Sequence, residues 1–327
     1  MGQLVKLQDY ISRYEQDIYR YQTQFVRLKK QQWSKLHAAF LAGELYEMLQ
    51  DDEEDDWITE KPTFIEKLKS AVKRKVSKEE LVRIEDVQID TQEDEFQMQL
   101  SIIPRTEEDL KVAFLNRLFD FQMKWATTTI RERSIVDPSF YQDEQLKFFL
   151  QRFPDTFLVL FQPVLQLKKA PVETDTIILT PTATWCVSFL EEDEDAVFIG
   201  SDDKFWLEKH HHHPDKKILN PHISLKRTET IVRNIYDLYG VELPIKKAII
   251  SRTGYIDYPI VSHDLRLLDK RSFPQWFQSM RNLSSPLKSQ QLKGAEALLN
   301  YCQTTSTMRL EWNDPIEFSD EAETETK

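Results

Sequence analysis

Apolar residues recur along the first part of the chain with alternating spacings of three and four positions. The run begins at Leu4 and Leu7 and continues to Phe25 and Leu28. This is the spacing of a heptad repeat, so it predicts an amphipathic helix with a coiled-coil-like seam over residues 4–28. Several seam positions are bulky aromatics, which favours packing against another part of the same chain over a two-stranded zipper.

Basic residues seven positions apart run through the same segment: Lys6, Arg13, Arg20 and Arg27. On a helix they would lie along one side, either as a solvated face or as a contact for an acidic partner or phosphates. The acidic run at residues 51–56 then reads as a solvated linker.

Residues 64–76 form a basic helical pattern that includes Lys73, Arg74 and Lys75, and residues 87–103 alternate like a strand. Thr106 is followed by three acidic residues, which predicts a capped helix start. That helix has to end before Pro138, because the residue before a proline is pushed out of the helical region.

The middle of the chain has a definite order of predicted elements. A helical pattern is followed by strand patterns, an acidic loop, a second helix that begins at Asn220-Pro221 and ends at Gly240, and a last strand. The ranges are helix 142–152, strands 156–161, 164–167, 174–179 and 184–190, helix 220–240 and strand 244–251. This α-β-β-β-α-β order predicts an α/β fold with a mixed sheet and helices packed on it.

These patterns divide the chain into four predicted parts. Residues 1–50 are an amphipathic helical region, and residues 51–135 are an acidic linker with a mixed α/β region. Residues 136–258 hold the α-β-β-β-α-β core, and residues 259–327 hold two further helices and an acidic tail of disordered composition.

Composition narrows the classes of function. With 43 Lys and Arg against 55 Asp and Glu in 327 residues, the net charge of −12 disfavours wholesale electrostatic binding to nucleic acid or anionic membranes. The longest uncharged run is too short to span a bilayer, which excludes a transmembrane helix, and we expect no membrane partner. Two cysteines and the lack of a basic-then-apolar leader predict a cytoplasmic protein.

Residues 173–190 read ETDTIILTPTATWCVSFL, and this stretch resembles a motif of the nuclease-related domain (NERD) family of bacteria. That family belongs to the PD-(D/E)xK nuclease superfamily, and its motif has the form e-I-D-h-h-h-h-x-P-x-G-h-a-h-h-E-h-K, where h is apolar and a is aromatic. Trp206, Asn220-Pro221 and Lys226-Arg227 are similar to later landmarks of the family. The resemblance implies a restriction-endonuclease-like core over residues 136–258 and a divalent-metal nuclease centre.

Asp175 keeps the first catalytic position of that motif, but the other two positions differ. Ser188 stands where the family has Glu, and Leu190 stands where it has Lys. The family chemistry needs two carboxylates to hold a hard divalent ion, with a lysine to orient water and stabilise phosphate charge. We therefore expect Asp175 to be a vestigial catalytic and metal position in a degenerate centre that holds no cofactor.

Two other interpretations of Asp175 stay open. It is a working ligand if migrated groups replace the missing ones, with Mg²⁺ or Mn²⁺ as cofactor. Candidates for that role are Asp143, Glu144, Glu192, Lys226 and Arg227. Alternatively, Asp175 is a surface carboxylate at a strand start, without any role in chemistry.

Three functional hypotheses follow. The leading one is a degenerate NERD-like module that binds nucleic acid or protein, with Lys226, Arg227 and the basic residues 73–75 as nucleic-acid contacts. The second is an active, divergent nuclease that uses Asp175. The third is an interaction protein that works through its N-terminal helix.

Two other groups of residues have plain interpretations. His210 to His213 are consecutive and lack the ligand spacing of a structural zinc site, so we expect an exposed loop. Cys186 lies in a predicted strand among apolar residues, which predicts a buried thiol rather than a nucleophile.

Overall fold

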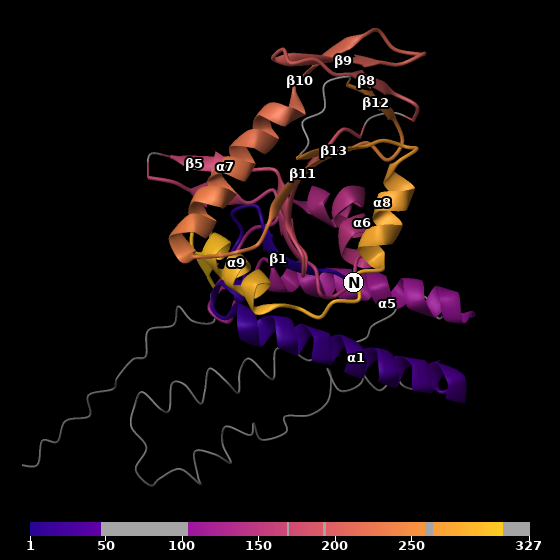
Figure 1. Ribbon diagram of the computed structural model, residues 1–327. Coiled ribbons are helices and arrows are strands. Elements are labelled where there is room, and N and C mark those ends of the chain that lie inside the picture. Colours follow the sequence, from indigo (N-terminus) through magenta and orange to yellow (C-terminus); the bar gives the residue numbers. More distant parts are fainter. Residues whose placement is uncertain (47–103, 169, 192–193, 259–263, 310–327) are drawn as a thin grey trace, which may run out of the picture.

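A computed structural model describes residues 1–46, 104–168, 170–191, 194–258 and 264–309 (Figure 1). A central six-stranded sheet carries helices on both faces, and a smaller sheet stands at one end of it (Figure 1). The predicted α/β class is therefore confirmed at the level of a mixed sheet with packed helices. Every helix within the described residues is too short or too polar to cross a bilayer.

The central sheet has the order β1-β3-β6-β7-β11-β13. Neighbouring strands run antiparallel at β3-β6 and β6-β7, and parallel at β1-β3, β7-β11 and β11-β13. The strands are β1 (Gln3–Leu7), β3 (Leu158–Phe161), β6 (Thr176–Leu179), β7 (Thr184–Phe189), β11 (Ile245–Ile250) and β13 (Leu265–Leu268).

The predicted order of elements in the middle of the chain is present. Helix α6 (Glu144–Arg152) precedes β3, β6 and β7, and helix α7 (Pro221–Tyr239) carries the chain across to β11. Asn220 caps α7 through its side chain, and Gly240 ends it in the left-handed conformation with φ 60°. The run at 164–167 pairs elsewhere: β4 (Val164–Gln166) forms a hairpin with β5 (Pro171–Glu173).

An apolar layer covers each of the two faces of the central sheet. Strand alternation places Ile177 and Leu179 in the layer under α7 and α9 (Ser289–Leu299), and Ile178 in the layer under α6 and α8 (Phe273–Arg281). Aromatic rings of α6 and α8 fill the second layer, where Phe153 and Phe277 lie 5.4 Å apart.

The predicted helix over residues 4–28 is wrong in its first part. Gln3–Leu7 form β1, which is fully buried beside β3, and helix α1 (Ile18–Ala42) begins only after its N-cap Asp17. A short apolar run buried on both sides fits a strand as well as a helical repeat, and pairing with β3 decides the matter. α5 (Glu107–Trp125) lies against α1, and the expected capping box is present at Thr106 (Figure 1).

The expectation that the seam aromatics pack within the chain is confirmed. Tyr14, Tyr21 and Phe25 surround Trp125 of α5, with ring centroids 6.1, 5.4 and 6.3 Å away. Each of these four side chains is buried. Edge-on contacts of this kind stabilise aromatic clusters beyond the area they bury.

The expected row of four basic residues on one helix is also wrong. Lys6 is buried on β1 and pairs with Glu15, while Arg13 is buried with its guanidinium over the ring of Trp125. Only Arg20 and Arg27 lie on α1, because the helix starts after the first two basic positions.

Three strands of a second sheet, β8 to β10, take the place of the predicted acidic loop between β7 and α7, and β12 joins them from beyond β11. Its order is β10-β9-β8-β12, and it stands at the top of Figure 1. The strands are β8 (Val197–Ile199), β9 (Phe205–Lys209), β10 (Lys216–Leu219) and β12 (Tyr255–Asp257). Short two- and three-residue apolar runs leave little periodicity for a sequence pattern to detect.

Strand β1 is an edge strand, and one side chain of α5 satisfies two backbone groups at its start. The amide of Gln122 accepts a hydrogen bond from the Leu4 N–H and donates one, at 3.0 Å, to the Gly2 carbonyl. Gln122 is buried, so water cannot replace it.

We predict that Gln122→Leu destabilises the fold by about 2–4 kcal/mol, because it leaves two buried backbone groups without partners. Urea denaturation followed by circular dichroism measures this change. The matched control is Gln151→Leu, which removes an exposed amide contact with Asn116 and is expected to cost under about 0.5 kcal/mol. Equal effects of the two substitutions would contradict the role given to Gln122.

Candidate functional site

A cavity of about 720 Å³ opens at one edge of the central sheet. Because β1, β3 and β7 run parallel to one another and β6 runs against them, the carboxyl ends of the first three meet the start of β6 at this edge. Asp175 and Ser188 both line the cavity. The sheet topology therefore brings together two of the positions that the sequence singled out.

Asp175 lies immediately before β6 and is held by helix α7. The Thr228 hydroxyl donates to Oδ2 of Asp175 at 2.9 Å and accepts from the backbone N–H of the same residue at 3.1 Å. The Ser224 hydroxyl, one helical turn earlier, donates to Oδ1 at 3.1 Å. Both hydroxyls sit on one face of α7 because they are four residues apart.

Ser188 completes this arrangement from β7. Since Thr176 pairs with Val187 across the two strands, residue 188 stands opposite residue 175. The Ser188 side chain also lines the cavity beside Asp175 and helps to lower the pKa of that carboxyl. Leu190, two positions on, packs against the apolar layer under α7 and contributes no polar group.

Burial raises the pKa of Asp175 above its usual value, and the hydroxyls of Thr228, Ser224 and Ser188 oppose that rise. The carboxylate therefore has neutral hydroxyls as its direct partners. Within the described ranges, no three His, Cys, Asp or Glu side chains are close enough to hold a metal ion.

The groups considered as migrated partners of Asp175 lie in different places. Asp143 caps α6 by accepting from the Leu146 N–H at 2.8 Å, and Glu144 is exposed. The next residue, Gln145, lines the cavity instead. Neither acidic side chain is part of the cavity wall.

The two basic candidates, Lys226 and Arg227, lie in different places. Arg227 reaches the rim, where it donates to the Glu173 carbonyl at 3.1 Å and lowers the pKa of Asp175 through its charge. Lys226 is exposed on α7 and does not line the cavity. Glu192 and the basic residues 73–75 lie outside the described residues.

Sequence reasoning missed most of the cavity wall. Four glutamines line it, and they come from four separate segments of the chain: Gln8, Gln145, Gln162 and Gln303. It also missed Glu191, which lines the cavity and forms an ion pair with Arg252. Single polar residues at strand ends carry no motif, so only the fold shows that they converge.

The other sequence candidates lie away from the cavity wall. His210 to His213 connect β9 and β10, and the His210 ring nitrogen Nε2 lies 3.0 Å from the Glu194 carbonyl oxygen. Cys186 is fully buried in β7, as predicted, and burial raises the pKa of its thiol well above the usual range.

A second ionic group, which the sequence also did not indicate, lies on β11. Lys247 is buried and pairs with Glu229 of α7 at 2.6 Å and with Asp264 at 2.7 Å. Burial opposes the charge of Lys247, but the two carboxylates outweigh it and raise the pKa of the lysine. We interpret this group as a structural link between α7 and the sheet.

Comparison with known proteins gives one short likeness. No family model matches the chain, and no solved structure matches it significantly. A stretch of 70 residues, 21% of the chain, is 41% identical to an RNA 2',3'-cyclic phosphodiesterase from Geobacillus stearothermophilus. The matched stretch spans 22% of the length of that protein, so it does not assign a family to the whole chain.

The raised pKa of Asp175 predicts a pH dependence of stability. A carboxyl whose pKa is higher in the folded state than its unfolded value of 3.8 favours folding below that value. This contribution is lost as the pH rises through the folded-state pKa. The stability of the natural chain relative to Asp175→Asn should therefore fall between pH 3.8 and neutrality.

Urea denaturation of both proteins across this pH range measures the difference. Other titrating groups act alike in the two chains and cancel, so the difference reports on Asp175 alone. A difference that rises with pH would show that the hydrogen bonds outweigh burial at this carboxyl.

Proposed function

We propose that residues 136–258 form a NERD-like, restriction-endonuclease-like core whose nuclease centre no longer cuts, and that the protein works as a binding module. The run α6-β3-β6-β7-α7-β11 supports this proposal, since it has the element order that the resemblance implies. The adjacency of Asp175 and Ser188 across β6 and β7 supports it further, because the family chemistry needs those two positions side by side.

The observation that carries the proposal is the set of partners around Asp175. A metal-dependent nuclease presents carboxylate oxygens to a hard cation and keeps a positive group for the phosphate. Here both carboxylate oxygens of Asp175 accept hydrogen bonds from hydroxyls, and Leu190 replaces the positive group with an apolar one. Each missing group is worth about 3–4 kcal/mol of transition-state stabilisation.

We predict no cleavage of labelled single- or double-stranded DNA or RNA in Mg²⁺ or Mn²⁺ above the level seen in EDTA. Asp175→Ala should leave this background unchanged, because the carboxylate takes no part in any reaction. Gel analysis of the products measures both. Metal-dependent cleavage that Asp175→Ala abolishes would instead establish the active, divergent nuclease.

A gain-of-site variant serves as the matched control for the same assay. Ser188→Glu places a second carboxylate beside Asp175, because the strand register sets residue 188 opposite residue 175. Calorimetric titration should detect Mn²⁺ binding to this variant but not to the natural chain. The signal should disappear when Asp175→Ala is added, which separates this site from unspecific surface binding.

The short likeness to an RNA 2',3'-cyclic phosphodiesterase adds RNA to the substrates tested but does not supply a catalytic centre. Metal-free hydrolysis of a phosphodiester needs acid and base groups that face the same cleft. The histidines within the described residues lie on α1, on the β9–β10 connection and on α7, and none lines the cavity. We therefore do not base the proposal on that activity.

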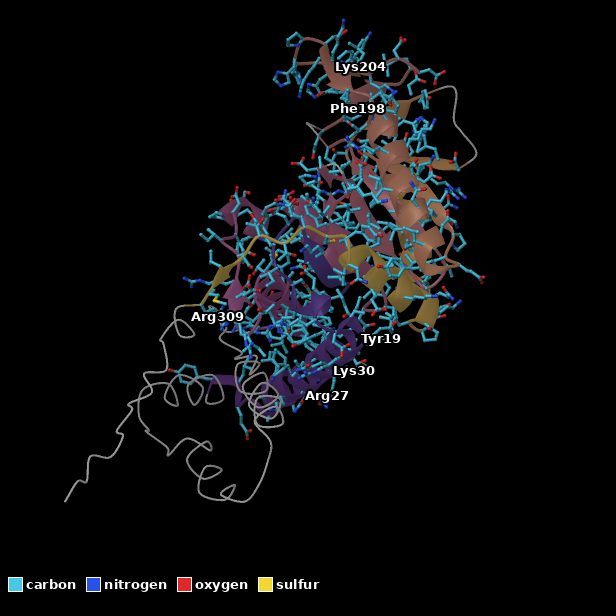
Figure 2. All side chains as sticks on the ribbon, turned by 90° about the vertical axis from the view of Figure 1, so that its left-hand side faces the viewer. Tyr19, Arg27, Lys30, Phe198, Lys204 and Arg309 are labelled. Atoms are coloured by element: carbon cyan, nitrogen blue, oxygen red, sulfur yellow. The ribbon has the colours of Figure 1, made fainter. Side chains whose placement is uncertain are left out.

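A separate observation favours nucleic acid as the partner of the module. Helix α1 contains no Asp or Glu in 25 residues, although the whole chain carries a charge of −12. Its exposed side presents Arg20, Arg27, Lys30 and Lys35, which we call the α1 basic face. Figure 2 shows Arg27 and Lys30 at one end of the molecule and Lys204 at the other.

We predict that nucleic acid binds to the α1 basic face through its phosphates. Arg27→Glu combined with Lys30→Glu should weaken binding at least tenfold and reduce the slope of log K against log salt by about 2, one for each lost phosphate contact. Fluorescence anisotropy with labelled DNA and RNA at several salt concentrations measures both quantities.

The control for this experiment is Lys204→Glu, which changes the same kind of charge at the opposite end of the molecule (Figure 2). It should leave the affinity within about twofold. Binding that does not depend on salt, or that responds equally to both substitutions, would favour a protein partner of the N-terminal helix instead.

A further inference from the structure

Residues 310–327, which we call the C-terminal acidic segment, carry seven Asp and Glu residues against one lysine. The segment itself lies outside the described residues, but the place where it leaves the fold is described. A negative segment attached to a folded chain is attracted to any basic surface within its reach. The position of its attachment and the nearest basic surface therefore indicate what it binds.

The last described residues lie close to the start of helix α1. The Thr304 hydroxyl donates to Oε2 of Glu15 at 2.9 Å, and Glu15 lies three residues before α1 begins. Strand β14 (Thr307–Met308) then pairs with β2 (Glu132–Arg133), and the backbone N–H of Arg309 extends this pairing. Figure 2 shows Arg309 in the same lower half of the molecule as Arg27 and Lys30 of α1. The acidic segment therefore starts near the α1 basic face.

The whole α1 basic face lies within reach of the segment. Its last residue, Lys35, follows the first residue of α1 by 17 positions, or about 26 Å along a helix. Eighteen residues of extended chain span up to about 60 Å. The segment is long enough to cover the path from Arg309 and to run beside the entire face.

The charges of the segment and of the face are complementary. Arg27, Lys30 and Lys35 are exposed and form no ion pair with the described residues, whereas the neighbouring Lys29 is paired with Asp155. No acidic residue of α1 offsets their charge. Exposed ion pairs are individually weak and are screened by salt. Attachment makes weak pairs sufficient, because the effective concentration of a tethered segment is of the order of millimolar.

We propose that the C-terminal acidic segment binds the α1 basic face of the same chain and competes there with nucleic acid. Its carboxylates take the positions of the phosphates, so nucleic acid has to displace the segment in order to bind. The competition rests on the proposed function, whereas the contact between the segment and α1 does not.

The contact is tested without nucleic acid. The probe is a fluorescein-labelled peptide of residues 310–327, and the protein is the full chain with amides in place of the seven carboxylates, which we call the neutral-tail variant. Fluorescence anisotropy should show binding at least about fivefold tighter to this variant than to the natural chain, whose own segment occupies the face. The substitutions are Glu311→Gln, Asp314→Asn, Glu317→Gln, Asp320→Asn, Glu321→Gln, Glu323→Gln and Glu325→Gln.

Charge reversal localises the contact. Arg27→Glu combined with Lys30→Glu, added to the neutral-tail variant, should abolish binding of the peptide. Both side chains are exposed, so the fold is expected to persist, and circular dichroism checks this. Lys204→Glu, at the opposite end of the molecule (Figure 2), should change the affinity for the peptide less than about twofold.

The competition is tested with labelled DNA and RNA. The neutral-tail variant should bind them at least about fivefold more tightly than the natural chain at low salt, and the difference should shrink as salt is added. The matched control is the full chain with amides in place of the six acidic residues at 51–56, which changes the net charge by nearly the same amount. It should raise the affinity less than about twofold, because it leaves the C-terminal acidic segment intact.

Three results would overturn the proposal. The first is a peptide that does not bind the neutral-tail variant at millimolar protein, or that Lys204→Glu weakens as much as the α1 substitutions do. The second is an equal gain in nucleic-acid affinity from the control at 51–56, which would show a general effect of charge. The third is self-association of the natural chain that the neutral-tail variant lacks, which would assign the segment to a second copy.

The inference and the proposed function fail separately. If no variant binds nucleic acid, the proposed function and the competition are contradicted, but the peptide titration still decides whether the segment contacts α1. If nucleic acid binds to α1 and the peptide does not, the proposed function stands without this contact.

Discussion

The contact between Thr228 and Asp175 sets the geometry of the whole site. The Thr228 hydroxyl accepts a hydrogen bond from the backbone N–H of Asp175 and donates one to its carboxylate. These two bonds fix the start of β6 relative to α7. Helix α7 in turn covers β7 and β11 and carries Glu229, which pairs with the buried Lys247 of β11. The Asp175 carboxylate therefore connects α7 to the central sheet, and both of its oxygens already accept hydrogen bonds from the protein.

The two charged regions of the molecule differ in the sign of their charge. The cavity beside Asp175 is lined by carboxylates and amides, whereas the α1 basic face lies on a helix with no acidic residue. Nucleic acid held at the cavity would meet negative charge without a metal ion to offset it. Under the proposed function, nucleic acid therefore binds along α1 rather than at the cavity.

Much of the core could be predicted from the sequence, because its signals are local. The cap at Asn220, the glycine at the end of α7 and the alternation along β6 and β7 each follow from a few neighbouring residues. Strand β1 could not be predicted, since Leu4 and Leu7 fit a heptad as well as a buried strand. The cavity wall was out of reach for another reason: the left-handed backbone of Gln8 and Gln162 follows from tertiary pairing alone.

The two departures from the nuclease motif make physical sense together. A buried carboxylate without a metal ion needs hydrogen-bond donors, which Ser224 and Thr228 supply, and Ser188 stands where a second carboxylate would repel Asp175. Without a metal and a phosphate, a lysine at position 190 would place an unpaired charge against the apolar layer under α7, where Leu190 packs instead. On the proposed function, these two residues leave a hydrogen-bonded junction between α7 and β6 where the nuclease family has a metal site.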